Sequence, residues 1–190
     1  MKTPVFIITL LIICGSFGQM EAATGKFRLS YNNDPSTSIV IGWDQISGDF
    51  PVVWYDEIDH GRQVDQYRFS AKPSEFNQEK QMKNFFAFLS GLKPGTTYYF
   101  VIKDNEGVSD RYYFQTIPNN SDTRLSIIAG GDSRNNWEAR RSANLMVSKL
   151  RPHFVMFGGD MTELSTAQQW KSWFEDWQLT IAADGRITPI

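Results

Sequence analysis

The sequence predicts a β-sandwich followed by an incomplete α/β domain that begins with the order βαβαβ. Residues 26–117 contain short runs of alternating apolar and polar residues, separated by turn residues and with no helical pattern between them. After the polar stretch at 118–122, continuous apolar runs alternate with amphipathic helices. We therefore place the sandwich at 24–118, a linker at 119–123 and the α/β part at 124–190.

The N-terminal residues have the pattern of a signal peptide. Lys2 supplies a positive charge, and residues 5–13 form an apolar run that is too short to span a bilayer. Ser16 and Gly18 are the small residues that precede a cleavage site, so we expect the signal peptide at 1–18. Cleavage near 22–23 and a buried N-terminal strand are the alternatives that fit less well. We expect a secreted or periplasmic protein with no membrane span after cleavage.

The cysteine content gives no sign of disulfides in the mature protein, and the charge gives no sign of nucleic-acid binding. Cys14 is the single cysteine and lies in the predicted signal peptide, so the mature chain would carry no disulfide. The alternative is a lipidated cysteine of a bacterial lipoprotein. The 19 Lys and Arg residues are balanced by 21 Asp and Glu residues, which gives no signal for nucleic-acid binding.

Six runs in the first domain have the composition and the period of β-strands: 38–43, 52–55, 67–70, 84–89, 97–103 and 111–116. We expect Trp43 to lie in the core between the two sheets. Tyr98 stands near the start of a strand, a position typical of a tyrosine corner, in which the hydroxyl bonds back to the preceding loop. The run from Leu92 to Tyr98, Leu-x-Pro-x-Thr-x-Tyr, resembles the fibronectin type III domain, so the sandwich is expected to be fibronectin type III-like.

The α/β part is predicted to contain strands at 125–129 and 154–157, each buried on both faces, and a third strand that begins at 187–190. A first helix is expected to begin at an Asn135 cap and to end before Pro152. Its predicted apolar face consists of Ala139, Ala143, Leu145, Met146 and Leu150. A second helix is expected at 166–181 after a capping box of Ser165 and Gln168. An aromatic stripe lies along it and is predicted to pack in the core: Trp170, Trp173, Phe174 and Trp177.

The two strands end in the same way, with Gly-Gly-Asp. The first is followed by Gly130, Gly131 and Asp132, and the second by 158–160, which ends at Asp160. A glycine pair lets the chain turn sharply, and the carboxyl ends of neighbouring parallel strands meet at one edge of a sheet. Two carboxylates that converge there favour a bound cation, and a hard divalent or trivalent metal is the natural partner.

These repeated motifs resemble the first two metal-binding motifs of calcineurin-like metallophosphoesterases. Together with the preceding sandwich, the arrangement is similar to purple acid phosphatases, which carry an N-terminal fibronectin-like domain. The resemblance implies that Asp132 is a terminal ligand of one metal and that Asp160 bridges two, with Fe, Zn, Mn and Mg not distinguished. It implies hydrolysis of phosphate esters on a phosphorylated small molecule or protein.

Two positions depart from the pattern of the family. Arg134 stands where many members have a histidine, and we interpret it either as a phosphate contact or as a salt-bridge partner of the site carboxylates. Glu163 stands where purple acid phosphatases have a metal-binding tyrosine, and we favour the interpretation that it only precedes the helix. The Asn-His motif of the family should follow the third strand and does not occur before Ile190. His153 is no substitute, because it lies at the opposite end of its strand. The chain therefore resembles the front portion of a longer protein.

The alternative function is a non-catalytic secreted module, in which the fibronectin-like domain serves binding or adhesion. Dinucleotide binding at the first strand–helix turn is disfavoured, because residues 130–132 lack the Gly-x-Gly-x-x-Gly spacing.

Overall fold

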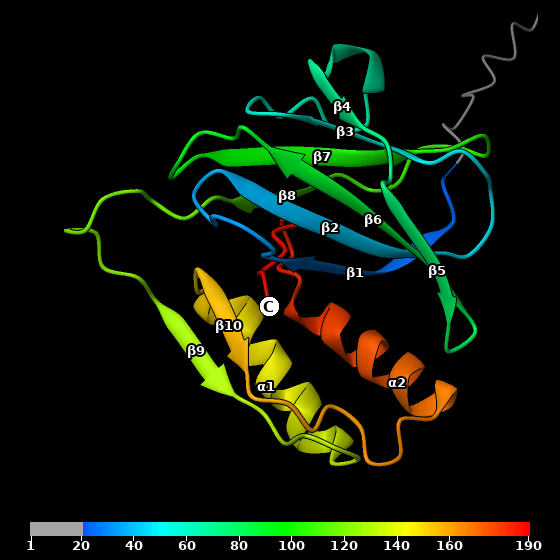
Figure 1. Cartoon of the computed structure of the whole chain (residues 1–190), viewed down its shortest axis with the longest axis vertical. Coiled ribbons are helices and arrows are strands. Elements are labelled where there is room, and N and C mark those ends of the chain that lie inside the picture. The colour runs from blue at the N-terminus through cyan, green and yellow to red at the C-terminus, as the bar shows by residue number, and fades with distance from the viewer. Residues whose placement is uncertain (1–20) are drawn as a thin grey trace, which may run out of the picture.

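A computed structural model describes residues 21–190, so the predicted signal peptide and Cys14 lie outside the described part of the chain. Two four-stranded sheets form a sandwich, and a smaller layer of two strands and two helices lies against one side of it (Figure 1). The fold class is therefore the predicted one: a β-sandwich followed by a short α/β portion.

The first sheet has the strand order β1-β2-β6-β5, and the second has the order β4-β3-β7-β8, with antiparallel neighbours throughout. The strands of the first sheet are β1 (Thr24–Ser30), β2 (Ser38–Gln45), β5 (Glu75–Glu79) and β6 (Met82–Ser90). Those of the second are β3 (Val52–Asp56), β4 (Phe69–Ala71), β7 (Thr97–Lys103) and β8 (Tyr112–Gln115), and the 3-10 turn η1 (Val64–Gln66) precedes β4.

The six predicted strands are confirmed, but the sequence reading missed the edge strands β1 and β5. Strand β1 contains a register shift between Gly25 and Arg28, which breaks the alternation of apolar and polar residues. Strand β5 is exposed along its whole length and therefore has no apolar face to detect. Strand β5 therefore escapes detection because the period-2 signal requires one buried face, and β1 because the shift interrupts the alternation.

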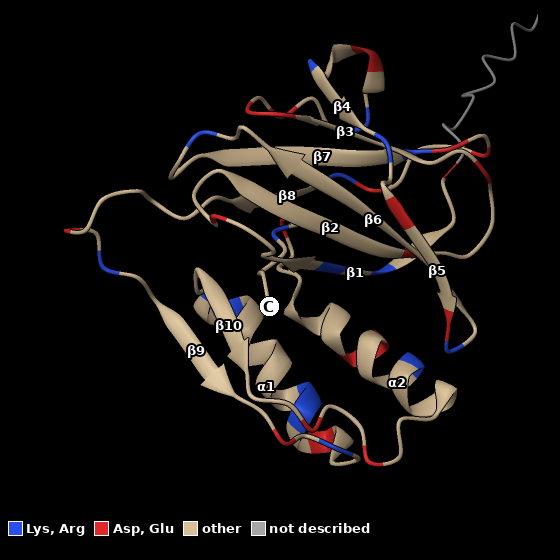
Figure 2. Cartoon of the chain, viewed as in Figure 1, with Lys and Arg blue, Asp and Glu red and all other residues tan. Residues whose placement is uncertain are grey.

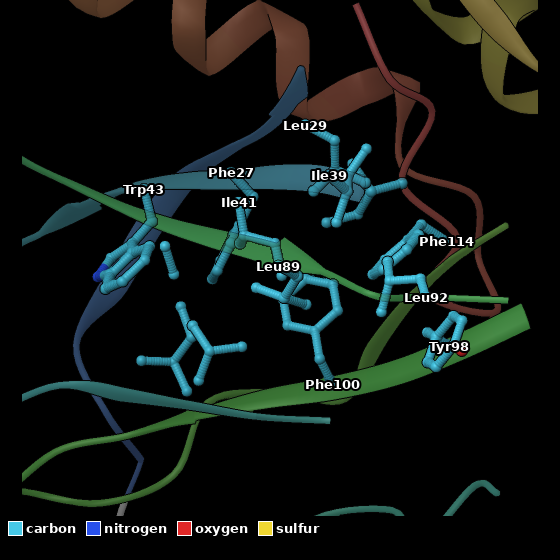
Figure 3. Close-up of a cluster of buried hydrophobic side chains, with 14 residues drawn as sticks. Phe27, Leu29, Ile39, Ile41, Trp43, Leu89, Leu92, Tyr98, Phe100 and Phe114 are labelled. Carbon is cyan, nitrogen blue, oxygen red and sulfur yellow. The ribbon is translucent and has the colours of Figure 1, made fainter. Parts of the chain in front are cut away.

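The core lies between the two sheets, where large apolar side chains from both meet (Figure 3). Trp43 is fully buried there, as predicted, and its indole donates to the Gln45 side-chain oxygen at 2.8 Å. The Gln45 amide in turn donates to Asp104 at 2.6 Å. The buried polar atom of the tryptophan is therefore satisfied, as burial requires.

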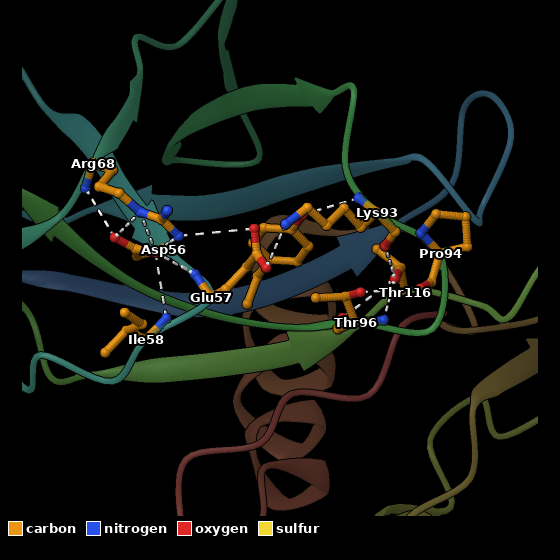
Figure 4. Close-up of polar contacts among 9 residues, drawn as sticks. Asp56, Glu57, Ile58, Arg68, Lys93, Pro94, Thr96 and Thr116 are labelled. Atoms are coloured by element: carbon orange, nitrogen blue, oxygen red, sulfur yellow. Dashed lines mark hydrogen bonds and ion pairs between the residues drawn. The ribbon is translucent and has the colours of Figure 1, made fainter.

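The tyrosine corner is confirmed. Tyr98 is buried, and its hydroxyl accepts a hydrogen bond from the Lys93 backbone N–H at 2.9 Å. The Thr116 hydroxyl fixes the same loop, because it donates to the Lys93 carbonyl at 2.6 Å and accepts from the Thr96 N–H at 2.9 Å (Figure 4). The loop before β7 is thus held at both ends.

A buried carboxylate fixes the same end of the second sheet, where Asp56, the last residue of β3, pairs with Tyr99 near the start of β7. Asp56 is fully buried and accepts hydrogen bonds from the Arg68 guanidinium and from the backbone N–H of Glu57 (Figure 4). The hydrogen bonds from Arg68 hold the pKa of the Asp56 carboxyl far below its usual range, although burial opposes this effect. The carboxylate therefore stays charged and anchors strand β4 to β3.

The α/β layer consists of β9 (Ile127–Gly130), α1 (Trp137–Leu150), β10 (Phe154–Phe157) and α2 (Ala167–Trp177), followed by the 3-10 turn η2 (Gln178–Thr180). The two strands are parallel, with Phe154 opposite Ile127. The predicted helix caps are wrong by one residue each. Asn136 caps α1, and Thr166 caps α2 with its side chain accepting from the Gln169 N–H at 3.3 Å.

The predicted burial of the α/β layer needs correction. On α1 the buried residues are Arg140, Asn144 and Val147, whereas the apolar residues Leu145, Met146 and Leu150 are 44%, 49% and 60% exposed. Hydrogen bonds between the helices explain the difference. Arg140 and Asn144 both donate to Asp176 of α2, so the face of α1 that carries these two polar residues is the buried one.

The strands of the α/β layer are likewise not buried on both faces. Val155 is buried, but Ile127 and Met156 on the same two strands are about half exposed. The described residues cover only one face of this two-stranded sheet. The aromatic stripe on α2 does pack inward as predicted, with Trp173 and Trp177 stacked at a centroid distance of 5.3 Å.

The predicted third strand at 187–190 does not form as a regular strand. Residues 178–190, here named the closing segment, instead run between the sandwich and the α/β layer, where the C-terminus lies (Figure 1). The Pro189 carbonyl accepts from the Val155 N–H at 2.8 Å, so the segment does lie beside β10. The Ile187 N–H donates to Tyr113 of β8 at 2.9 Å, and the Ile187 side chain is 1% exposed within the sandwich core.

The closing segment also covers the free edge of β1. The Gln178 side-chain amide accepts from the Phe27 N–H at 2.8 Å and donates to the Phe27 carbonyl at 3.1 Å, as a neighbouring strand would. The Ile190 N–H donates to the Leu29 carbonyl at 2.9 Å. Residues distant in sequence therefore complete the sandwich, and the boundaries at 118 and 124 stay a prediction.

An ion-pair cluster joins the end of α1 to the same segment. Arg151, the left-handed cap of α1, contacts Asp184 at 2.8 Å and donates to the Tyr113 hydroxyl at 2.5 Å. The Arg151 guanidinium holds the pKa of the Asp184 carboxyl far below its usual range.

None of the helices in residues 21–190 is long and apolar enough to cross a membrane.

If the closing segment completes the sandwich core, Ile187→Ala should lower the free energy of unfolding by about 2–4 kcal/mol, because it leaves a cavity between the sheets. Urea unfolding monitored by tryptophan fluorescence measures this loss. Leu150→Ala, at a 60% exposed position, is the matched control and should change the stability by less than about 0.5 kcal/mol. Equal, small effects of both changes would show that Ile187 is not part of the core.

Candidate functional site

Two glycine pairs shape the carboxyl edge of the small parallel sheet. The Gly158 N–H donates to the Gly130 carbonyl at 2.6 Å, so the chain segments after β9 and β10 remain in contact beyond the strands. A Cβ atom at Gly131 would lie 2.9 Å from the Gly158 nitrogen, closer than side chains tolerate. Gly159 has a φ of +98°, which only glycine adopts without strain. Glycine is therefore required where the two turns meet.

The two turns bring Asp132 and Asp160 to the same edge. The Asp132 N–H donates to the Gly159 carbonyl at 2.9 Å, which ties the first turn to the second. Both aspartates have left-handed backbone conformations, with φ of +54° and +51°. Their carboxylates are largely exposed to solvent, with 71% and 58% of the side-chain surface accessible.

One guanidinium joins the two carboxylates. The Arg134 Nε lies 2.8 Å from Asp132 Oδ1, and its Nη2 lies 2.8 Å from Asp160 Oδ2. The hydrogen bond to Asp160 and the negative charges of Asp132, Asp160 and Glu163 raise the pKa of Arg134. Of the two interpretations of Arg134, the salt bridge is present in the structure, whereas the phosphate contact stays a prediction.

The backbone of Arg134 is held on both sides. Its N–H donates to the Asp160 carbonyl at 2.9 Å, and its carbonyl accepts from the Arg140 Nη1 at 2.6 Å. Arg140 is 7% exposed and is itself fixed by Asp176, at 2.9 Å from its Nε and 2.5 Å from its Nη2. A chain of polar contacts therefore runs from α2 through α1 to the two aspartates.

Sequence reasoning missed the Arg140–Asp176 pair. Both residues lie on predicted helices where a charged residue is ordinarily assigned to the solvent face. The pairing crosses from one helix to the other over 36 positions, so no local spacing rule could indicate it.

Two pockets border this edge of the sheet. One, of about 460 Å³, lies between the N-terminal part of α1 and the length of α2, and its lining includes Arg134, Trp137, Arg141, Glu175 and Asp176. The other, of about 310 Å³, lies between the sheet and α1, is mainly apolar, and has Asp132 at its rim. Figure 2 shows acidic and basic residues close together along the loops after β9 and β10.

The donor set fits part of a metal centre. The carboxylates of Asp132 and Asp160 converge closely enough to share one guanidinium, so they could share a cation. Within residues 21–190, however, no group of three or more His, Cys, Asp or Glu side chains is gathered in a way that could hold a metal. A hard divalent ion takes about six oxygen ligands, so these two aspartates supply only some of the donors.

The other titratable candidates lie apart or have a different role. The His153 ring accepts from the Ser126 N–H at 3.0 Å, at the amino end of β10, and this agrees with its exclusion as a ligand. Glu163 lies in the exposed loop before α2, and only its charge reaches Arg134.

Comparison with known proteins supports the same architecture. Residues 25–116 match the family model of the purple acid phosphatase N-terminal domain. The search of curated proteins gave no match.

Two solved structures share the arrangement of both layers. The chain is similar to the purple acid phosphatase PPD1 from yellow lupin (Lupinus luteus) seeds, with 13% identity, a TM-score of 0.65 and coverage of 89% of this chain and 34% of that one. It is also similar to PhoD, with 15% identity, a TM-score of 0.56 and coverage of 89% and 38%. The chain thus spans little more than a third of the length of either, and at these identities the likeness shows the fold.

The family match covers the sandwich, and the structural matches cover 89% of the chain, which is more than the sandwich alone. The protein is therefore purple acid phosphatase-like, with the N-terminal domain of that family at residues 25–116.

Proposed function

We propose that the protein takes part in the metal-dependent hydrolysis of phosphate esters, with Asp132 as a terminal ligand and Asp160 as a bridging ligand of a dinuclear site. The observation that carries this proposal is the convergence of the two carboxylates on one guanidinium at the carboxyl edge of a parallel sheet. That edge is where α/β folds bind their ligands. Further ligands would have to come from outside residues 21–190.

Two divalent or trivalent ions of Fe, Zn, Mn or Mg would supply positive charge that stabilises the negative charge developing on the phosphoryl group. The residues of this chain would hold the metal ions and orient the phosphate group. Asp160 is held toward the first turn by the bonds of its backbone carbonyl and its side chain to Arg134, and the resemblance to metallophosphoesterases gives it the bridging role. Arg134 would contact a phosphate oxygen of a phosphorylated small molecule or protein, since a guanidinium can bind phosphate through two hydrogen bonds.

We also propose that the protein is secreted or periplasmic after removal of residues 1–18. The N-terminal pattern supports this, and the folded part supports the cleavage position. Ala22 is 3% exposed, and the Ala23 carbonyl accepts from the Ile46 N–H at 2.8 Å. Cleavage after Ala23 would remove both contacts and cleavage after Ala22 would remove the first, whereas cleavage after Gly18 preserves both.

Asp160→Asn should abolish specific Mn²⁺ binding to the chain, and Asp132→Asn should weaken it nearly as much, because each change removes one anionic ligand. Isothermal titration calorimetry at low ionic strength measures the affinity. Asp122→Asn removes the same charge from the exposed linker and is the matched control, with an affinity expected to stay within twofold. Unchanged binding in both site variants would refute the ligand assignment and favour the non-catalytic module.

The 190-residue chain should show no phosphatase turnover, because two carboxylates cannot fix two metals at the separation of roughly 3.5–4 Å that a bimetallic site needs. The assay uses an aryl phosphate with manganese, zinc or iron supplied, against a metal-only control. Turnover well above this control that disappears in Asp160→Asn would show that residues 1–190 already form a competent site.

A further inference from the structure

The Arg134 side chain occupies the position between the carboxylates where a cation would bind. Its guanidinium contacts one oxygen of each aspartate at 2.8 Å, so it bridges the two strand ends as a bound cation would. Two carboxylates close enough to contact one guanidinium repel each other, and a positive charge between them offsets that repulsion. In the structure, therefore, the carboxylates are held together by the chain's own cation.

The backbone of Arg134 is fixed more firmly than its side chain. Its backbone is bonded on both sides, to the Asp160 carbonyl and to Arg140, and has a left-handed φ of +36° that a non-glycine residue adopts only when its surroundings impose it. The side chain, in contrast, is half exposed and is held only by the two exposed carboxylates. Such exposed ion pairs contribute little individually, so the side chain can leave at small cost.

A second position for the guanidinium lies beside the first. Arg134 lines the pocket of about 460 Å³ that also contains Trp137 and Arg141. Arg141 lies 3.6 Å from Asp176, whose other oxygen is already bonded to Arg140. Glu175 and Asp176 also line this pocket, so their carboxylates offer the Arg134 guanidinium other acidic neighbours once it has turned away from Asp132 and Asp160.

We infer that Arg134 is a placeholder cation, which holds Asp132 and Asp160 in position before metal binding and is displaced by the metal toward the pocket. This inference rests on the proposed function, because it takes the two aspartates as metal ligands. It assigns Arg134 a positioning role with an unusual consequence. The residue that keeps the site assembled also competes with the metal, so its removal should strengthen metal binding.

The test is the affinity of the chain for Mn²⁺ alone, measured by isothermal titration calorimetry in low salt. Arg134→Ala should bind Mn²⁺ about three- to tenfold more tightly than the original chain, since the metal no longer displaces two ion pairs. Arg124→Ala is the matched control, because it removes the same charge from an exposed position before β9, outside the pocket, and its affinity should change by less than about twofold. The gain in Arg134→Ala should shrink at high salt, which screens exposed charges.

A second readout follows the side chain directly. The Nε–H signal of Arg134 in a ¹H–¹⁵N spectrum, assigned by its loss in Arg134→Lys, should shift away from its carboxylate-bonded position when Zn²⁺ is added. Circular dichroism establishes that each variant is folded. Should Arg134→Ala be unfolded, Arg134→Gln takes its place, with the same tightening expected.

The outcomes separate this inference from the function on which it rests. If Asp160→Asn binds Mn²⁺ as well as the original chain, the ligand assignment is wrong. If Asp160→Asn loses the metal but Arg134→Ala binds it equally or more weakly, the aspartates are ligands and the placeholder role is wrong. An unmoved Nε–H signal at saturating Zn²⁺ would also overturn the placeholder role.

Discussion

The closing segment, residues 178–190, is the constraint on which the rest of the structure depends. A two-sheet sandwich has an open side where the edges of its sheets leave backbone groups unpaired and apolar side chains uncovered. Here Ile187 fills the space between the sheets, while Gln178 takes the place of a strand beside β1. The same segment lies against β10 through Pro189. The sandwich and the α/β layer therefore share one core, and the small sheet has a fixed orientation relative to the large ones.

A short series of contacts in the α/β layer positions the residues of the candidate site. The meeting of two glycine turns brings Asp132 and Asp160 to one edge, and Arg134 neutralises them. The buried Arg140–Asp176 pair holds the Arg134 backbone from α2, the helix that also anchors the closing segment. Folding and site geometry are thus linked, because the elements that complete the sandwich also position the carboxylates.

The sequence was most informative where one local rule decides the structure. A period-2 run located β7 and a continuous apolar run located β10 at their observed bounds, and the position of Tyr98 predicted its corner hydrogen bond. The repeated Gly-Gly-Asp motif located both aspartates. What could not be predicted depends on contacts distant in sequence. The edge strand β1, the inward turn of Arg140 and the route of Ile187 into the sandwich are decided by partners that no local pattern identifies.

The central claim is that the edge at Asp132 and Asp160 is a cation site that Arg134 fills when no metal is bound. The most direct measurement is the crystal structure of the chain grown with Mn²⁺, with the metal located by its anomalous scattering. We expect one anomalous peak within bonding distance of carboxylate oxygens of both aspartates, with the Arg134 guanidinium turned toward Trp137 and Glu175. A peak at any other place, or the Arg134 bridge intact beside a fully occupied metal, would contradict the account.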